Sequence, residues 1–161
     1  PAVKSIEERP ESINKRENIG DFEIDTVIQT RAKNECLLTL TDRKSRYQII
    51  RLIPDKSAFS VNQALKAILK DYQMNSITAD NGAEFSRLAE VFDPTHIYYA
   101  HPYSSWERGT NENHNRLIRR WLPKGSKNAT QQQVAFIENW INNYPKKLFN
   151  YKSPKEFLQA G

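Results

Sequence analysis

Residues 22–28 of the chain read FEIDTVI, and this stretch decides the architecture that we expect. Its side chains alternate between the two faces of a strand, as the period of two in a β-strand requires. One face carries the large apolar residues Phe22 and Ile24, and the other carries Glu23, Asp25 and Val27. The sequence therefore predicts a strand that is apolar on one face and carries two acidic residues on the other.

Two further strand patterns follow closely, CLLTLT at residues 36–41 and YQIIRLI at residues 47–53. The short polar stretch between them, residues 42–45, is typical of a tight turn, so we expect an antiparallel three-strand meander. Further along the chain, helical patterns alternate with short strand patterns. The expected elements are a helix capped by Ser57, a strand at 76–79, a short helix at 84–92, a strand at 96–99, helices at 110–122 and 131–144, and a last short helix from residue 153. This order predicts an α/β fold with a mixed sheet, the meander plus parallel strands, flanked by helices.

The length of 161 residues fits one domain. Residues 1–20 are polar and carry a mixed-charge run, so we interpret them as a linker or arm that precedes a core domain at residues 21–161. The single cysteine, Cys36, permits no internal disulfide and is expected to be a small buried apolar side chain. No apolar run approaches the roughly 20 residues of a membrane span, so no membrane contact is expected.

The positive charge is concentrated in the last third of the chain. Residues 1–100 hold 14 Lys and Arg against 15 Asp and Glu, whereas residues 101–161 hold 10 against 4, and the whole chain has a formal net charge of +5. A basic part beside a carboxylate-rich part favours a polyanionic partner held against an acidic site. A charge excess that only improves solubility explains the same numbers equally well.

Three acidic residues occupy positions where a packed domain has little use for them. Asp25 lies inside a largely apolar strand, Asp80 follows a strand immediately before Asn-Gly, and Glu112 lies near the start of a helix. Ligand sites in open sheets lie at such strand ends. Three carboxylates that come together repel one another and need cations to remain ionised, and oxygen ligands favour Mg²⁺ or Mn²⁺. Two such ions can stabilise in-line displacement at a phosphodiester.

Each acid also has a purely structural explanation. Asp25 can pair with an arginine at a strand edge, and Asp80 can form a turn. The carboxylate of Glu112 can interact favourably with the positive N-terminal end of its helix. Spacing alone does not decide between the two explanations.

The residues around these acids carry a family resemblance. Residues 77–85, ITADNGAEF, resemble the second-aspartate motif of retroviral-integrase-like transposases, and residues 99–113, YAHPYSSWERGTNEN, resemble the third motif of the IS30 family of insertion-sequence transposases. The segments LIRR at 117–120, LPKG at 122–125, PKKL at 145–148 and YKSP at 151–154 continue the match. The second motif is widespread among integrase-like proteins, whereas the long third motif is specific. The resemblance extends from about Arg9 to the C-terminus.

This resemblance implies a ribonuclease-H-like fold and a DDE triad made of Asp25, Asp80 and Glu112 that is both catalytic and metal-binding. It also implies an enzyme that cuts DNA and joins strands with Mg²⁺ or Mn²⁺, with two ions expected. The expected partners are the ends of a mobile element, target DNA and further copies of the chain, in the bacterial cytoplasm at the nucleoid. The sequence departs from the family pattern at residues 20–23, GDFE in place of GHWE, and at Arg116, where glycine is usual. Glu23, on the same strand face as Asp25, is the rival first ligand.

The densest cluster of basic residues lies on and just after the helix that carries Glu112. We expect it to contact the DNA backbone, although a cluster of charges is often only a solvated face. The predicted DNA-binding residues are Arg108, Asn111, Asn113, Arg116, Arg119, Arg120, Lys124 and Lys127. Arg108 has a second interpretation, a surface ion pair with Glu107 or Glu112, and the asparagines can instead cap the helix.

Several other residues are expected to be structural. Four large apolar side chains in the basic part are expected in the core: Trp121, Phe136, Trp140 and Leu148. The lone histidines His101 and His114 are expected on loops or at the surface, since a metal site would need partners that the sequence does not show. Glu84 is a further acid that we interpret as structural.

The residues by themselves predict a metal-dependent phosphoryl-transfer site beside a basic surface, and the resemblance narrows this to a DNA transposase. Two alternatives remain. One is a ribonuclease-H-like nuclease that cuts without joining. The other is a catalytically inactive DNA-binding remnant of a transposase, against which the presence of all three acids argues.

Overall fold

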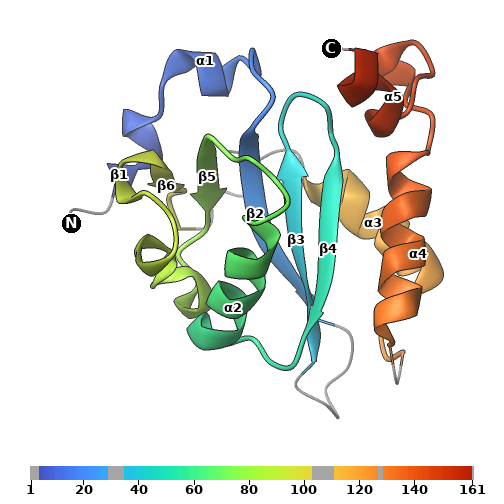
Figure 1. The fold of residues 1–161 in the computed structure, drawn as a ribbon, viewed down its shortest axis with the longest axis horizontal. Helices are drawn as coiled ribbons and strands as arrows, with labels where there is room; N and C mark the ends of the chain where they lie inside the picture. Colours follow the sequence, from blue (N-terminus) through green and yellow to red (C-terminus); the bar gives the residue numbers. More distant parts are fainter. Residues whose placement is uncertain (1–3, 29–34, 103–110, 127–128, 161) are drawn as a thin grey trace.

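A mixed β-sheet forms the centre of the protein (Figure 1). The structure is a computed structural model and describes residues 4–28, 35–102, 111–126 and 129–160. Within these residues the sheet has six strands in the order β1-β6-β5-β2-β3-β4. Their bounds are β1 Lys4–Ser5, β2 Asp21–Ile28, β3 Cys36–Asp42, β4 Gln48–Ile53, β5 Ser76–Ala79 and β6 Ile97–Tyr99. Strands β2, β3 and β4 are antiparallel neighbours, whereas β1, β6, β5 and β2 run parallel. The predicted meander and mixed sheet are confirmed.

The turn between β3 and β4 is held by a buried carboxylate, that of Asp42. Its Oδ2 accepts hydrogen bonds from the backbone N–H of Ser45 at 2.6 Å and from the Ser45 hydroxyl at 2.7 Å. Its Oδ1 accepts the N–H of Gly20 at 2.7 Å, which ties the start of β2 to the same turn. Gly20 has φ of +113°, a conformation that glycine adopts without strain. The Asp42 side chain therefore supports the turn beside its backbone hydrogen bonds and ties it to the start of β2.

Helix α2 (Ala58–Ile68) covers one face of the sheet, where it lies in front of the strands in Figure 1. It begins where the sequence predicts, because the Ser57 hydroxyl accepts the N–H of Ser60 at 3.1 Å. Val61, Leu65 and Ile68 are buried against the sheet. The core on this face also contains Cys36, as expected, and burial raises the pKa of its thiol to about 11.

Helices α3 (Asn111–Trp121) and α4 (Gln131–Asn142) cover the opposite face. Leu117 and Ile118 of α3 pack with Val134, Ile137 and Ile141 of α4. This second core also contains one residue from each strand of the meander, Val27, Leu37 and Ile50. Helix α5 (Pro154–Ala160) follows α4 near the C-terminus (Figure 1).

The N-terminal segment, part of the expected linker or arm, packs on the sheet. β1 pairs with β6, and the 3-10 helix η1 (Ile6–Glu8) and helix α1 (Glu11–Asn14) follow it. Ile6 and Ile13 are buried, and Arg9 is buried with its Nη1 donating to the Thr78 hydroxyl at 3.2 Å. The expected boundary between an arm and a core domain at residue 21 stays a prediction.

The prediction of one continuous short helix at residues 84–92 is wrong. Two 3-10 helices occupy this stretch, η2 (Ala83–Phe85) and η3 (Leu88–Glu90). Phe85 in η2 and Leu88 in η3 are both fully buried, so each of these short helices is anchored in the core by one apolar side chain. The 3-10 helices η4 (Pro94–His96) and η6 (Lys147–Phe149) complete the described elements.

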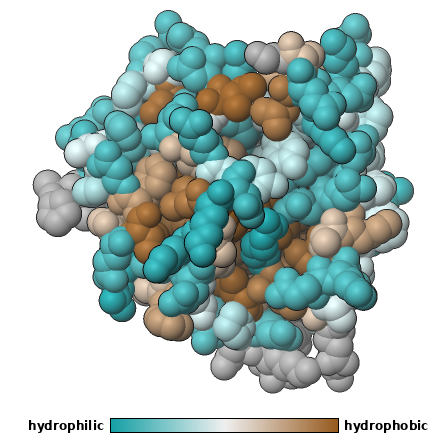
Figure 2. All heavy atoms as spheres, in the orientation of Figure 1, coloured by the Kyte–Doolittle hydropathy of each residue, from teal (hydrophilic) through white to brown (hydrophobic). Residues whose placement is uncertain are grey.

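Hydrophilic residues occupy much of the face drawn in Figure 2, with apolar residues visible between them. Among the described helices, none has the combination of length and apolar character that a membrane span needs.

Candidate active site

Asp25 lies in the middle of β2 on the face that α3 and α4 cover. Phe22 and Ile24 belong to the core beneath α2, so the alternating residues Glu23, Asp25 and Val27 point to the opposite side. Val27 packs in the core of α3 and α4. Asp25 is half-buried, and its Oδ1 accepts the N–H of Thr26 at 2.9 Å.

The register of the sheet aligns Asp80 with Asp25. β2 and β5 run parallel with Glu23 opposite Thr78, and continuing this register by two residues sets Asp25 opposite Asp80. Ile77 and Ala79 lie in the core beneath α2, so Asp80 shares the face of Asp25. Neighbouring strands lie about 4.8 Å apart, which is close enough for two facing carboxylates to share a cation.

A network of hydrogen bonds holds the loop that follows Asp80. Its carboxylate Oδ1 accepts the N–H of Gly82 at 2.7 Å, and the Asn81 side chain donates to the carbonyl oxygen of Ala100 at 2.5 Å. A Cβ on Gly82 would meet the Asp80 Oδ1 at 2.9 Å and would also collide with the Glu84 carboxylate. Glycine at this position therefore lets the loop fold over both acids.

Glu84 is held by protein groups, which agrees with its expected structural role. Its side chain is buried, and its Oε2 accepts the Thr26 hydroxyl at 3.1 Å and lies 3.3 Å from the Lys56 ammonium. Glu84 thereby links the loop after β5 to β2 at the residue beside Asp25.

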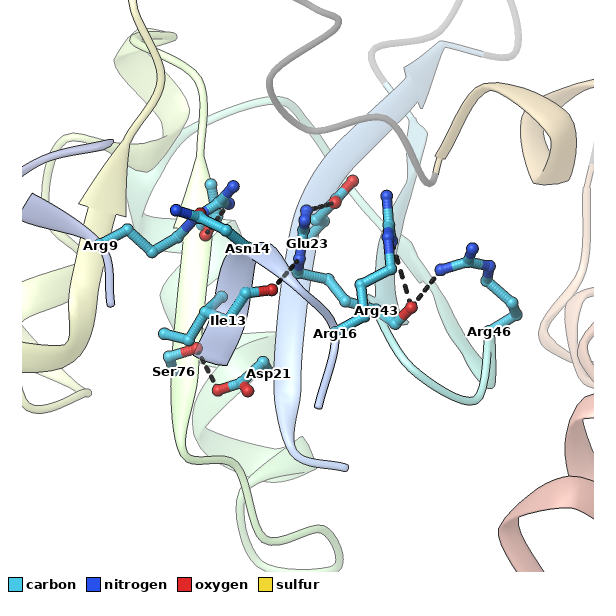
Figure 3. Close-up of polar contacts among 10 residues, drawn as sticks. Arg9, Ile13, Asn14, Arg16, Asp21, Glu23, Arg43, Arg46 and Ser76 are labelled. Carbon is cyan, nitrogen blue, oxygen red and sulfur yellow. Dashed lines mark hydrogen bonds and ion pairs between the residues drawn. The ribbon is translucent and has the colours of Figure 1, made fainter. Parts of the chain in front are cut away.

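Glu23, the rival first ligand, is engaged in a buried ion pair. Its side chain is fully buried, and its Oε2 pairs with Nη1 of Arg43. The Arg43 Nε also donates to the carbonyl oxygen of Ile13 at 3.2 Å. Figure 3 shows Glu23 and Arg43 together with Arg16 and Arg46, whose guanidinium groups both donate to the Arg43 carbonyl oxygen. A carboxylate that neutralises a buried guanidinium is poorly suited to bind a metal ion at the same time.

Glu112 lies in the first turn of α3, the helix that packs against β2 through Leu117 and Ile118. The side chains of Asn111, Glu112 and Asn113, and the whole of Arg108 and Lys127, lie outside the described residues. Among the residues that are described, no group of three His, Cys, Asp or Glu side chains forms a metal site. The two aspartates nevertheless offer oxygen ligands only, a set that suits Mg²⁺ or Mn²⁺.

The predicted basic residues of α3 differ in their surroundings. Arg116 and Arg120 are exposed, as is Lys124 after the helix, whereas Arg119 is half-buried and burial lowers its pKa. The guanidinium of Arg120 lies 5.6 Å from the centre of the Trp140 ring, which is a cation–π contact.

The prediction that four large apolar residues lie in the core is wrong for three of them. Trp121 is 42%, Phe136 54% and Leu148 66% exposed, whereas Trp140 is half-buried. Trp121 contacts Phe136 and Trp140 edge to face, with ring centres 5.1 Å and 5.3 Å apart. Trp121, Phe136 and Trp140 therefore form an aromatic patch, of which Trp121 and Phe136 are exposed.

The histidines His101 and His114 differ in their exposure. His101 is partly exposed and lies 3.3 Å from Glu7, as a loop residue should, but the surface placement of His114 is wrong. His114 is 1% exposed, and burial together with nearby Lys146 and Arg46 lowers its pKa to about 3. Its position three and four residues before Leu117 and Ile118 is the signal that places it on the buried side of α3.

Comparisons with curated proteins and with solved structures both find proteins similar to the chain. No model of a protein family matches the chain. The chain is 44% identical over 159 residues to a probable transposase for the insertion-like sequence element IS1161 of Streptococcus salivarius, which covers 97% of the chain and 46% of that protein. It is 40% identical to the transposase for IS4351 of Bacteroides fragilis, over 97% of the chain and 49% of that protein. The transposase InsI for IS30C of Escherichia coli is also 40% identical, over 97% of the chain and 42% of its own length.

The chain spans about half the length of these curated relatives. Among solved structures, the catalytic core domain of BIV integrase superposes with a TM-score of 0.68 at 16% identity, covering 88% of the chain and 95% of the integrase domain. The ribonuclease-H-like fold is thereby confirmed.

Proposed function

Across 97% of its length the chain is a relative of the IS30-family insertion-sequence transposases, and we propose that it is the catalytic core of a DDE-type DNA transposase. The observation that carries the proposal is the parallel pairing of β2 with β5, whose register, continued by two residues, sets Asp25 opposite Asp80 on the sheet face beneath α3. The substrates are DNA strands, and the enzyme is a polynucleotidyl transferase that works at the DNA of a bacterial cell. Several copies of the chain act together when two DNA ends are joined to a target.

Asp25, Asp80 and Glu112 are the proposed metal ligands. Asp25 lies in β2, Asp80 directly follows the neighbouring parallel strand β5, and the first turn of α3 supplies Glu112. Bound Mg²⁺ or Mn²⁺, with two ions expected, supplies Lewis-acid stabilisation of the attacking and leaving oxygens of a phosphodiester. The buried pair of Glu23 and Arg43 favours Asp25 over Glu23 as the first ligand.

The residues of the chain then perform two displacements at one site. In the first, a water oxygen attacks a phosphodiester, the bond to the 3′ oxygen breaks, and a free 3′ hydroxyl forms. In the second, this hydroxyl attacks a phosphodiester of the target, so that one new bond replaces one old bond. The role of the three carboxylates is to position the reacting groups, and basic residues of α3 hold the DNA backbone beside them. The proposed DNA-binding residues, on α3 and in the segments before and after it, are the basic residues Arg108, Arg116, Arg119, Arg120, Lys124 and Lys127 together with Asn111 and Asn113.

A joining assay tests this function. The chain is incubated with Mn²⁺, a supercoiled plasmid and a labelled duplex that ends in a 3′ hydroxyl, and label joined to the plasmid is measured. We expect joining by the wild type and its loss in Asp25→Asn, Asp80→Asn and Glu112→Gln. Asp71→Asn removes an exposed carboxylate and is the matched control, which should retain joining.

The outcomes separate the alternatives. If the plasmid is nicked but carries no joined label, the chain is a hydrolytic nuclease and not a transposase. DNA binding without nicking or joining at any Mn²⁺ concentration would identify an inactive remnant.

A further inference from the structure

A pocket of about 360 Å³ lies between the C-terminal end of α3 and the N-terminal part of α4, two helices that pack on each other (Figure 1). This volume is within the range of about 300–1,000 Å³ that is usual for pockets that bind small ligands. The pocket is lined by Trp121, Leu122, Gln132, Gln133, Phe136 and Ile137. We call it the Trp121–Phe136 pocket.

Two aromatic rings form a corner of this pocket. The rings of Trp121 and Phe136 meet at 82° with their centres 5.1 Å apart, and both side chains are exposed. Leu122 and Ile137, which also line the pocket, are buried. Aromatic groups favour stacked and edge-to-face contacts, so a flat ligand can stack on one ring while its edge contacts the other. The shape therefore fits a flat aromatic group such as a nucleobase.

The charge around the pocket favours an anionic ligand. Residues 113–137, which contain all the residues that line it, hold five Lys and Arg and no Asp or Glu. The first acid after this range, Glu138, is engaged by Arg51, whose Nη1 lies 2.8 Å from its carboxylate. A nucleobase in a DNA strand has a negatively charged phosphate on either side of it. Aromatic side chains beside basic groups are the combination that binds single-stranded nucleic acid.

Two of these cations flank Trp121 in the sequence. Arg120 precedes it, Lys124 follows it by three residues, and both side chains are exposed. The guanidinium of Arg120 lies 5.6 Å from the centre of the Trp140 ring, and Trp140 contacts Trp121 edge to face. This cation–π contact holds a positive charge beside the aromatic rings. It can pair there with a phosphate of the strand whose base enters the pocket.

A second copy of the chain is the other candidate for an exposed aromatic surface. A symmetric dimer through this pocket would place the same surface of both copies face to face. The cations of residues 113–137 would then lie opposite the same cations of the partner, and like charges across an interface repel each other. The charge that favours DNA therefore opposes self-association at this pocket.

We propose that the Trp121–Phe136 pocket binds one unpaired nucleobase of a DNA strand, with Arg120 and Lys124 on the phosphates beside that base. The choice of DNA rests on the proposed function. Trp121 lies nine residues after Glu112 on the same helix, about 14 Å along its axis. A strand with about 3.4 Å between nucleotides covers this distance in about four nucleotides. The pocket therefore holds an opened strand near the cut, and it does so without reading sequence, since every base has a flat face.

Single strands with and without bases test the proposal. The ligands are a fluorescent oligothymidylate and a base-free strand of the same length and charge, and anisotropy measures their affinities for the wild type, Phe136→Ala and Phe59→Ala. Phe59 is exposed on α2, across the sheet from the pocket, so its variant is the matched control. We expect Phe136→Ala to weaken oligothymidylate binding at least about 5-fold, the smaller effect of losing one base stack. It should leave the base-free strand unchanged, and Phe59→Ala should change neither affinity.

A series of salt concentrations separates stacking from the phosphate contact. Stacking releases no counterions, so Phe136→Ala should keep the wild-type slope of log K against log salt. Lys124→Met should lower this slope by about 0.7, the value for one phosphate contact of a single strand. It should also weaken binding of both strands. Lys70→Met removes an exposed charge just after α2 and should keep the slope.

Each outcome has one meaning. If Phe136→Ala binds oligothymidylate like the wild type, or loses both strands equally, the base site is overturned. An unchanged slope in Lys124→Met would overturn the phosphate contact. If the wild type sediments as a dimer and Phe136→Ala as a monomer, with equal oligothymidylate affinities, a second copy occupies the pocket and the proposal is wrong. If the wild type fails to join strands but Phe136→Ala still loses oligothymidylate alone, the proposed catalytic function is lost and the base site stands.

Discussion

The carboxylate of Glu23 neutralises the guanidinium of Arg43 in a buried pair, two residues before Asp25 on the same face of β2. Removing one partner of such a pair leaves a buried charge and costs about 3–5 kcal/mol. We therefore expect Glu23→Gln to lower the free energy of unfolding by about that amount. Asp25→Asn, at a half-buried position, should lower it by less than about 1 kcal/mol and should abolish strand joining. Urea unfolding of both variants measures the first effect.

The opposite result would assign the metal ion to Glu23 in place of Asp25. If Glu23→Gln folds as stably as the wild type but loses Mn²⁺ binding, Glu23 is the first ligand. Arg43→Met serves as the control, because it breaks the same pair without removing either acid and should be as unstable as Glu23→Gln.

Gly82 is close to two acids at once, and an added methyl group should disturb both. Its Cβ would lie 2.9 Å from the Asp80 Oδ1 and would collide with Glu84, although φ of −62° poses no backbone difficulty. Displacing a ligand by about 1 Å can cost about 100-fold in rate. We expect Gly82→Ala to weaken Mn²⁺ binding and to slow joining about 10- to 100-fold. The same substitution should lower the free energy of unfolding by about 1–3 kcal/mol.

Calorimetric titration with Mn²⁺ measures this effect. Ala83→Ser adds one atom at the neighbouring exposed position and should bind Mn²⁺ like the wild type. Unchanged Mn²⁺ affinity in Gly82→Ala would show that the loop geometry at Asp80 does not govern the metal site.

Local signals in the sequence predicted the sheet and the first helix well, because each has a short-range cause. The alternation in residues 22–28 specifies β2, and the hydroxyl of Ser57 specifies the start of α2. The pairing of β2 with β5 was not predictable in register, since no turn connects the two strands. The alignment of Asp25 with Asp80 therefore needed the structure.

The positions that were predicted wrongly depend on tertiary packing. Phe136 is large and apolar, but it lies two residues after the buried Val134, a rotation of about 200° around α4, and so faces solvent. His114 is polar, but it lies on the buried stripe of α3. Residue type alone was misleading in both cases, and helical position gives the correct side.

The contrast between Phe136 and its neighbour Ile137 is a direct test of this packing. Ile137 is 2% exposed and Phe136 54% exposed. Ile137→Ala leaves a cavity in the core of α3 and α4 and should cost about 2–5 kcal/mol. Phe136→Ala loses mainly one edge-to-face contact with Trp121 and should cost about 1 kcal/mol or less. Urea unfolding of both variants measures the difference, and equal losses would contradict the assignment of Phe136 to the surface.

His114 should make the chain sensitive to mild acid. Burial holds its pKa at about 3 in the folded chain, below the ordinary value of about 6.5 that applies after unfolding. Between these values only the unfolded chain binds the proton, so stability is lost as the pH falls from about 6.5. From pH 7 to pH 5 this one group removes about 2 kcal/mol. In His114→Gln, measured by urea unfolding at both pH values, the loss should shrink by that amount. His96→Gln, at an exposed position, is the control and should keep the pH dependence of the wild type. An unchanged pH dependence in His114→Gln would mean that His114 is protonated inside the folded chain.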